Sequence, residues 1–341
     1  EVIISKFSTG HVDVKHFVLI MDDGSFKYFG ANNNGQSQNG LTSPVYTPID
    51  WAPPTGQSLS TLKELVSIGN DDNWIVWVGN NGKHYAIGDN EHGQFGDGTA
   101  TPSGVWVELA WLDSKSVDQV IGGSTYNSGK SGDQWMAVRC GSEVWFTGKN
   151  TYGVNGSEPS VYTATKMPDS ADHIYTFGGG AATIFRQEGD DLFARGHSAH
   201  GQTGIVTNSV YDWNQINPVN FAGVKFYTTA HGHSQPYASN AFAVLTNGGT
   251  DRLFTIGSNR YGSYGLGYEN NRPVEGGMLE VPHPFLSPIK DIIINGHDDG
   301  TYSLVLLENG ELWGVGYGGR YNLSGVLVGQ RASDSTSIFR Q

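Results

Sequence analysis

Cysteine, positive charge and long apolar runs are all scarce in this chain of 341 residues. Cys140 is the only cysteine, so no disulfide can form within the chain. The chain has 20 lysines and arginines but 33 aspartates and glutamates. Its formal net charge of -13 would repel nucleic-acid phosphates. No apolar run approaches the roughly 20 residues of a membrane span. We therefore expect neither a nucleic-acid partner nor membrane insertion.

Glycine and aromatic residues are abundant instead. The chain has 48 glycines without a collagen period, which indicates many turns, and its 12% of aromatic residues supplies apolar surface for a core. It begins with Glu1-Val2-Ile3-Ile4 and no initiating Met, so we expect it to be part of a larger polypeptide or assembly.

The sequence repeats six times. A glycine that closes an aromatic-containing strand recurs at intervals of 48 to 61 residues, at Gly30, Gly88, Gly148, Gly196, Gly257 and Gly316. The repeats cover residues 1–52, 62–112, 116–169, 172–222, 223–286 and 289–341 approximately. They account for the full length, which predicts a single domain from 1 to 341.

Each repeat has the pattern of four strands. A short apolar strand, a connection of variable length and a second apolar strand lead to a turn such as Asp23-Gly24 or Asn81-Gly82. Such dipeptides between apolar runs predict hairpins with type I′ turns. A third strand ends at the closing glycine, and a weaker fourth strand completes the unit. Because open sheet edges are avoided, we expect residues 2–7 and 337–340 to lie in the same or adjoining blades.

A loop of fixed form follows five of the closing glycines. It reads GANNNGQ at 30–36, GDNEHGQ at 88–94, GKNTYGV at 148–154, GHSAHGQ at 196–202 and GSNRYGS at 257–263. Glycine and asparagine at fixed places predict positive φ, above all at the second glycine of each loop. The sixth copy is irregular and has Asn322 at that place, which also tolerates the left-handed region.

These loops resemble the repeat of the regulator-of-chromosome-condensation family, and the resemblance covers essentially the whole chain. It implies an all-β fold, a six-bladed β-propeller of four-stranded antiparallel blades. Stacked blades also cover faces that one sheet alone would leave exposed. Members of the family include the exchange factor for a nuclear small GTPase and a secreted inhibitor of β-lactamases, so the fold does not select a function.

The connections after the first strand of each repeat are the candidate binding loops, because they vary in length and topology places them at one end of the blades. The longest are predicted at 124–134 and 233–240, and shorter ones at 10–15 and 297–301. Their polar and aromatic side chains suit a protein or glycan partner. The candidate binding residues are Tyr126, Tyr237, His11, His233, His297 and Asp298.

Two alternatives concern the same region. His11, His16, His231, His233 and His297 follow first strands, with Asp13, Asp298 and Asp299 nearby, but no compact spacing predicts a metal site, and we expect no metal or cofactor. Trp74, Trp135 and Tyr302 either contribute to the binding surface or begin the second strand and point into the core. Cys140 occupies a hairpin turn without a neighbouring base, so we expect no nucleophilic catalysis.

The leading hypothesis is a non-enzymatic binding module that recognises protein or glycan. A composition rich in Asn, Gly, Ser, Thr and Tyr and poor in Lys and Arg favours an extracellular or virion-surface adhesin, for example a phage tail-fibre propeller. The alternative is a regulator of an enzyme, either a secreted inhibitor or a small-GTPase exchange factor.

Overall fold

The computed structural model describes residues 4–7, 9–11, 16–69, 73–127, 130–156, 159–177, 182–217, 223–228, 240–247, 250–259, 262, 265–266, 276–297, 300–317 and 335–340. The chain forms two compact units, Glu1–Thr151 with Glu158–Ala171 (unit 1) and Tyr152–Ser157 with Asp172–Gln341 (unit 2). Helix in the described part is confined to two short 3-10 turns, η1 (Leu59–Thr61) and η2 (Ala110–Leu112). Neither is long and apolar enough to cross a membrane.

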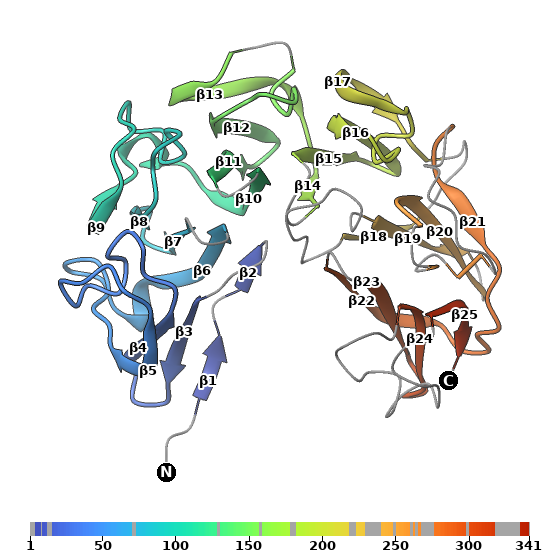
Figure 1. The fold of residues 1–341 in the computed structure, drawn as a ribbon, viewed down its shortest axis with the longest axis horizontal. Coiled ribbons are helices and arrows are strands. Elements are labelled where there is room, and N and C mark those ends of the chain that lie inside the picture. The colour runs from blue at the N-terminus through green and yellow to red at the C-terminus, as the bar shows by residue number, and fades with distance from the viewer. Residues whose placement is uncertain are drawn as a thin grey trace. The chain divides into compact units, whose positions relative to one another are not determined.

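Unit 1 contains three sheets, one for each of the first three repeats (Figure 1). Blade one consists of β1 (Ile4–Phe7), β3 (His16–Met21), β4 (Phe26–Gly30) and β5 (Val45–Asp50). Blade two consists of β2 (Thr9–His11), β6 (Leu62–Gly69), β7 (Asn73–Gly79), β8 (His84–Gly88) and β9 (Ser103–Glu108). Blade three consists of β10 (Val117–Asn127), β11 (Lys130–Cys140), β12 (Glu143–Gly148) and β13 (Val161–Ser170).

Unit 2 contains the sheets of the last three repeats. Blade four consists of β14 (His173–Thr176), β15 (Thr183–Glu188), β16 (Asp191–Ser198) and β17 (Thr207–Gln215). Blade five consists of β18 (Val224–Thr228), β19 (Asn240–Asn247), β20 (Thr250–Gly257) and β21 (Leu279–Val281). Blade six consists of β22 (Ile289–His297), β23 (Gly300–Leu307), β24 (Leu312–Tyr317) and β25 (Ser335–Arg340). The fold class is the predicted six-bladed β-propeller of four-stranded antiparallel blades.

Blade two departs from this plan by one strand. The sequence predicts a single first strand over residues 3–10, but β1 pairs antiparallel with β3 in blade one, whereas β2 pairs in parallel with β6. Because β6 would otherwise leave one edge open, the added strand gives its backbone groups partners. β1 and β25 belong to different sheets, the first and the sixth. Their location in adjoining blades stays a prediction, as does the single domain.

The hairpin turns between second and third strands that the structure describes, those of blades one to four and six, are not of the predicted type I′. In blade one Gly24 N–H donates to the Met21 carbonyl at 2.9 Å, and Gly24 has φ +82. Asp23 is not in the left-handed region, so the loop is a type I turn followed by a glycine bulge. Blades three and four use two-residue loops instead, with positive φ at Gly141 and Gly189 in the first position. Loop length therefore decides the turn type.

Another strand occupies the space of a side chain at three of the six closing glycines, Gly88, Gly148 and Gly196. All six have φ between +99 and +114. A Cβ at Gly88 would lie 2.4 Å from the Asn73 carbonyl oxygen, and one at Gly148 would lie 2.5 Å from that of Gln134. In each case the obstructing carbonyl belongs to the start of the second strand of the same blade. The repeat spacing of these glycines thus records a close approach of two strands.

Opposite each described closing glycine in blades one to four and six, the fourth strand bulges. In blade one Tyr28 faces Ile49 and Gly30 faces Val45, so residues 46–48 stand against a single residue of β4. The same shift occurs at 104–106, 162–164, 211–213 and 337–339. Such a bulge turns the backbone and re-aims side chains.

The bulge of one blade receives the fixed loop of the blade before it. Gly98 N–H donates to the Tyr162 carbonyl at 2.8 Å, and Ala164 N–H donates to the Gly96 carbonyl at 3.1 Å. The added Cβ of a residue at Gly93 would lie 2.1 Å from Tyr162 Cδ1, so the loop rests directly on the tyrosine. Gly35 lies against Gly104 in the same way, and Gly153 against Tyr211.

The second glycines of the loops adopt the predicted conformation. Gly35, Gly93, Gly153, Gly201 and Gly262 all have φ between +70 and +82. A glycine three residues later repeats it at Gly96, Gly156, Gly204 and Gly265, whereas Gln38 holds φ +60 at the corresponding place in blade one. The prediction of positive φ is confirmed.

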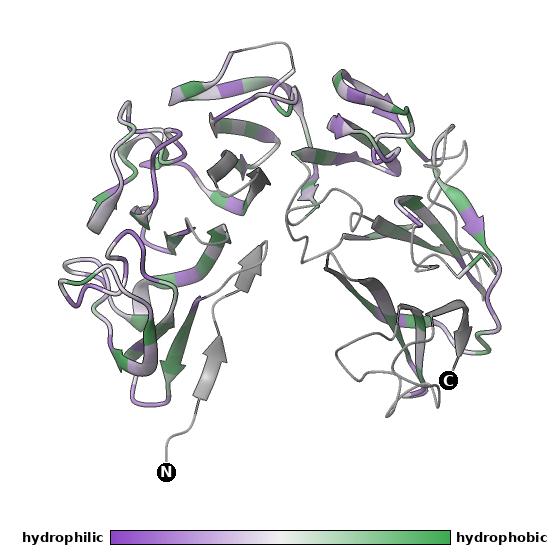
Figure 2. Cartoon of the chain, in the orientation of Figure 1, coloured by the Kyte–Doolittle hydropathy of each residue, from purple (hydrophilic) through white to green (hydrophobic). Residues whose placement is uncertain are grey.

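The hydrophobic core lies between neighbouring blades. One cluster joins blades one and two around Tyr28, Ile75 and Trp77, and a second joins blades two and three around Trp74, Val76 and Met136. In unit 2, equivalent clusters join blade four to five and blade five to six. Figure 2 shows hydrophobic residues within the sheets and hydrophilic ones in many of the turns that connect them.

We predict that Gly93 tolerates alanine less than Gly40 does. Gly40 has φ +77 but nothing within 4 Å of an added Cβ, so Gly40→Ala should cost only the left-handed strain of about 1–2 kcal/mol. Gly93→Ala adds the collision with Tyr162 and should cost about 1–3 kcal/mol more. Urea unfolding of the two variants measures the difference. Equal losses would show that the loop does not press on the outer strand.

Candidate functional site

Three of the six predicted binding residues lie in described strands. Tyr126 is in β10 opposite Ser131, and His297 ends β22 opposite Gly300. His11 ends β2 opposite Ile68 of β6. The other three, Tyr237, His233 and Asp298, lie outside the described residues.

The predicted loop over 124–134 of blade three is mainly a β-ribbon. Pairing between β11 and β12 stops at Trp135 and Gly148, whereas pairing between β10 and β11 continues to Asn127 and Lys130. The ribbon therefore extends beyond the blade. Its register shifts between Ser124 and Tyr126, which breaks the regular pairing at its base. We name residues 124–134 the projecting hairpin.

Unit 1 places the end of β2 at the same end of the blades as the projecting hairpin. β6 and β10 are both first strands and run toward the variable connections, and β2 runs parallel to β6. His11 and Tyr126 therefore lie toward one end of unit 1. The candidate functional site is this loop end, with the projecting hairpin as its most extended element.

The projecting hairpin has the composition of an adaptable recognition loop. Residues 124–134 read STYNSGKSGDQ, with one tyrosine among serine, glycine and asparagine. Tyrosine supplies a large contact area at little entropic cost, and small polar residues supply flexible hydrogen bonding. The segment contains one lysine and one aspartate, so it has no net formal charge.

Below this end, the second strands begin with a buried layer. Trp74, Trp135 and Thr183 are fully buried at equivalent positions, and so is His16 in blade one. The interpretation of Trp74 and Trp135 as binding residues is therefore wrong, because their indole rings belong to the core. Tyr302, at the corresponding place in blade six, is half-buried.

Two glutamines of the fixed loops, Gln36 and Gln94, form hydrogen bonds within this layer from one blade to the next. The Gln36 side-chain amide donates to Asn73 Oδ1, and that of Gln94 donates to Gln134 Oε1. All four side chains are buried. In the third loop and blade four, the equivalent positions hold Val154 and Ala182, both buried and both apolar. Gln36 and Gln94 thus meet polar partners, whereas apolar residues occupy both equivalent positions at the next interface, which the sequence pattern of a single loop does not reveal.

In three of the fixed loops, an asparagine or serine side chain accepts a hydrogen bond from the backbone of its own loop. Asn32 Oδ1 accepts from Ser37 N–H at 2.8 Å, and Asn90 Oδ1 accepts from Phe95 N–H at 2.9 Å. Ser198 Oγ accepts from Thr203 N–H at 3.0 Å in blade four. The loop is thus held by its own side chains before it meets the next blade.

His16 is the buried titratable group closest to the loop end of blade one. Its side chain stacks on Tyr28 with ring centroids 5.7 Å apart, and neither ring nitrogen has a hydrogen-bond partner among the described residues. Burial lowers the pKa of His16 to about 3. At neutral pH the imidazole is uncharged and cannot attract an anionic ligand.

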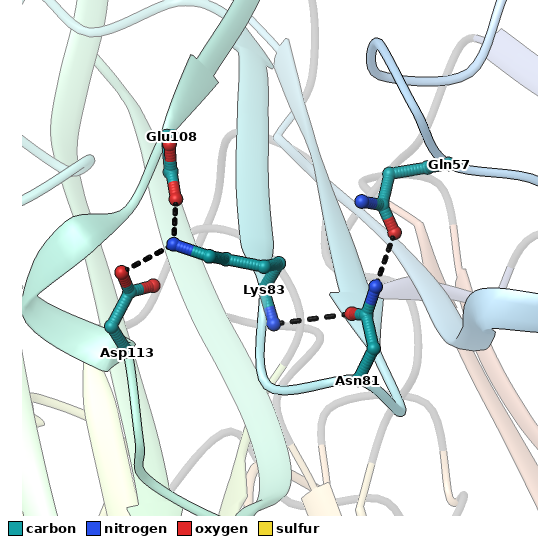
Figure 3. Close-up of polar contacts among 5 residues, drawn as sticks. All are labelled: Gln57, Asn81, Lys83, Glu108 and Asp113. Carbon is teal, nitrogen blue, oxygen red and sulfur yellow. Dashed lines mark hydrogen bonds and ion pairs between the residues drawn. The ribbon is translucent and has the colours of Figure 1, made fainter.

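A polar cluster lies at the opposite end of blade two (Figure 3). Lys83 Nζ lies 2.5 Å from Glu108 Oε1 and 2.7 Å from Asp113 Oδ2. Asn81 Oδ1 accepts from Lys83 N–H at 3.2 Å, and Asn81 Nδ2 donates to Gln57 Oε1 at 3.0 Å. The hydrogen bonds to Asp113 and then Glu108 raise the pKa of Lys83. The Lys83 ammonium is therefore already paired with two carboxylates of its own chain.

The described residues offer little for catalysis. Within those ranges, no three His, Cys, Asp or Glu side chains group as metal ligands would. Burial is the main cause that raises the pKa of the Cys140 thiol to about 11, so the thiolate is rare at neutral pH.

The fold resembles two solved structures over nearly all of this chain. A chain in the crystal structure of Kap60 bound to yeast RCC1 (Prp20) matches with a TM-score of 0.68 and 15% identity, over 98% of this chain and 74% of that one. Human WBSCR16 matches with a TM-score of 0.66 and 16% identity, over 99% of this chain and 82% of that one. No protein-family model matches the sequence. The chain has an RCC1-like β-propeller fold.

We predict that His16 makes stability depend on pH. Because its pKa is about 3 in the folded chain and about 6.5 when unfolded, the unfolded state gains the proton first as the pH falls. Stability should fall by about 1.5 kcal/mol between pH 6.5 and pH 5 from this group. His16→Phe keeps a ring against Tyr28 and should remove that part of the loss, as urea unfolding at both pH values measures. An unchanged slope would contradict the assignment.

The glutamine layer allows a double-mutant cycle. Gln36→Val and Asn73→Ala should each cost about 1–3 kcal/mol, because each removes the hydrogen bond between two buried amides. The double variant has the residue types that Val154 and Ala182 supply at the equivalent positions, so it should lose less than the sum of the two single variants. Additive losses in urea unfolding would mean that the two amides do not stabilise one another.

Proposed function

We propose that the chain is a non-enzymatic protein-binding module whose loop end carries the recognition surface. The projecting hairpin carries this proposal, because its backbone pairing continues past the point where the pairing of β11 with β12 ends, so the ribbon extends beyond blade three. Tyr126 on the hairpin and His11 beside it are the first candidate contacts in unit 1.

The partner class is supported by charge and by fold. The hairpin has no net formal charge and the whole chain is acidic, so a protein surface suits it better than nucleic acid. A protein of the same fold, yeast RCC1, is crystallised in complex with the protein Kap60. His297, Tyr237, His233 and Asp298 remain candidate contacts of the other blades.

The proposed setting is an extracellular or virion surface, as in an adhesin or a phage tail fibre. The low content of lysine and arginine and the single cysteine support it. Regulation of an enzyme is the alternative, since the family that the repeats resemble includes such regulators. The experiment below also distinguishes a glycan ligand from a protein partner.

We predict that a photo-crosslinking residue at Tyr126 forms discrete protein adducts, whereas one at Tyr162 does not. Tyr162 is the matched control, because it is an exposed tyrosine on the outer strand of the same blade. Labelling of intact cells of the source or host tests the surface setting, and labelling of a lysate tests the regulator. Mass spectrometry identifies the adducts.

A variant with a shortened projecting hairpin provides the second part of the binding experiment. Replacing residues 125–133 with Asn-Gly joins Ser124 to Gln134 by a tight turn and should abolish binding of the crosslinked partner while circular dichroism stays unchanged. A glycan array screened with both proteins detects carbohydrate binding directly. Adducts at Tyr162 alone, or full binding by the shortened protein, would move the site away from the hairpin.

A further inference from the structure

Asparagine is followed directly by glycine at seven places in the chain. These pairs begin at Asn34, Asn39, Asn81, Asn155, Asn247, Asn295 and Asn309. The structure describes both residues of every pair except the one at Asn247. In such a pair the backbone nitrogen of the glycine can attack the side-chain amide of the asparagine, because glycine has no Cβ to hinder the approach. The fold then determines which pairs react.

Three of the pairs share a turn that brings the reacting atoms together. In each, the backbone N–H of the second residue after the asparagine donates to the asparagine Oδ1, at 2.9 Å for Asn39, 3.2 Å for Asn81 and 3.0 Å for Asn309. This hydrogen bond closes a ring that contains both the asparagine Cγ and the glycine nitrogen, so the nucleophile lies near the carbon that it attacks. It also places a donor on the oxygen that gains negative charge during the attack.

The other described pairs are held by the fold. Gly35 N–H donates to the Asn32 carbonyl at 3.1 Å, and Gly156 N–H donates to the Gly153 carbonyl at 2.9 Å. Asn295 lies in the paired part of β22, where the backbone is extended. A nitrogen that is engaged in a hydrogen bond, or fixed in a strand, cannot turn toward the side-chain amide.

Among the three turns, the one at Asn39 restrains neither reacting group. Neither the N–H of the following glycine nor the Asn39 Nδ2 has a hydrogen-bond partner among the described residues, and both residues are exposed. In the turn at Asn309 the glycine N–H donates to the Leu307 carbonyl at 3.0 Å, which holds the nucleophile. The Asn81 Nδ2, the leaving group of that pair, donates to Gln57 Oε1 at 3.0 Å (Figure 3).

We propose that Asn39 is a site of spontaneous modification, at which the chain deamidates itself. The Gly40 nitrogen gives its proton to hydroxide from the solvent and forms a bond with Asn39 Cγ. The bond between Cγ and Nδ2 breaks, and Nδ2 takes a proton from water and leaves as ammonia. Water then opens the resulting succinimide ring at either carbonyl, which produces aspartate or isoaspartate at position 39. Overall, one water is consumed and one ammonia is released.

The position of Asn39 gives this modification a structural consequence. Asn32 Nδ2 donates to the Leu41 carbonyl at 2.8 Å, which fixes the chain directly after the pair. Aspartate adds only a negative charge, whereas isoaspartate inserts a methylene into the backbone and displaces Leu41. The same fixed loop lies against blade two, where Gly35 contacts Gly104. Isoaspartate should therefore weaken a contact between the first two blades.

The proposal is tested by incubating the whole chain in mildly alkaline buffer. Peptide mapping by mass spectrometry then measures the conversion of amide to acid at each asparagine. Asn39 should convert at least about threefold faster than Asn81 or Asn309, because an ordinary hydrogen bond restrains one reacting group at each of those sites. Isoaspartyl methyltransferase should label the Asn39 peptide first. Asn39→Gln should remove that label, because glutamine would have to close a larger ring.

A denatured sample and a second variant separate the effect of the fold from that of the sequence. In guanidinium chloride the turns and the restraining hydrogen bonds are lost, so Asn39, Asn81 and Asn309 should convert at similar rates. In the folded chain, Gln57→Ala releases the Asn81 amide and should raise its rate toward that of Asn39. The rate at Asn39 should stay unchanged in this variant, which makes it the internal control.

Three outcomes would overturn the assignment. They are equal rates at the three sites in the folded chain, the same order of rates in denaturant, and an unchanged rate at Asn81 in Gln57→Ala. Ageing should also lower stability in urea unfolding more for the unaltered chain than for Asn39→Gln, and equal losses would contradict the weakened contact. This chemistry is independent of the crosslinking at Tyr126, so its failure would not affect the function proposed above.

Discussion

The structure depends on places where two segments of the chain approach so closely that no side chain fits between them. The closing glycine lets the third strand pass the carbonyl at the start of the second, and the glycines of the loop let it lie on the bulge of the next blade. A Cβ at Gly96 would lie 2.4 Å from Thr147 Cγ2, so even alanine does not fit there. The loops of blades one, two and four are therefore aligned to the next blade by close backbone contact, and buried side chains fill the space between these pairs of sheets.

The same contacts reduce the exposure of sheet edges. Each fourth strand is an edge strand with backbone groups open to pairing by another chain. In β13 the preceding loop forms hydrogen bonds with the Tyr162 carbonyl and the Ala164 N–H, and Pro168 lacks an N–H farther along. Pro48 has the same effect in β5, and in β9 the Ser103 hydroxyl accepts from the Val105 N–H at 3.2 Å. In each of these three strands, a loop contact, a proline or a serine hydroxyl thus reduces the number of backbone groups that could pair with another chain.

Function is left to the elements that this framework does not need. Trp74, Trp135 and the glutamines of the fixed loops are buried, and Lys83 is engaged by Glu108 and Asp113. Among the described residues, the projecting hairpin in unit 1 is an element that this framework leaves available. It is a polar ribbon that extends from its blade, and it fits the proposal of a scaffold that presents contacts to a partner.

The sequence alone determined the blade plan, because its glycines recur wherever a side chain would collide or a backbone must enter positive φ. It also located the hairpins and the variable connections. Tertiary structure alone decided which side chains are available. His16 carries no local sign of burial, and for Trp74 the sequence left core and binding surface open, since the surfaces that cover both residues come from other strands. The pairing of Gln36 with Asn73 spans two repeats, and the register that turns residues 124–134 into a ribbon, or adds β2 to blade two, depends on partners distant in the chain.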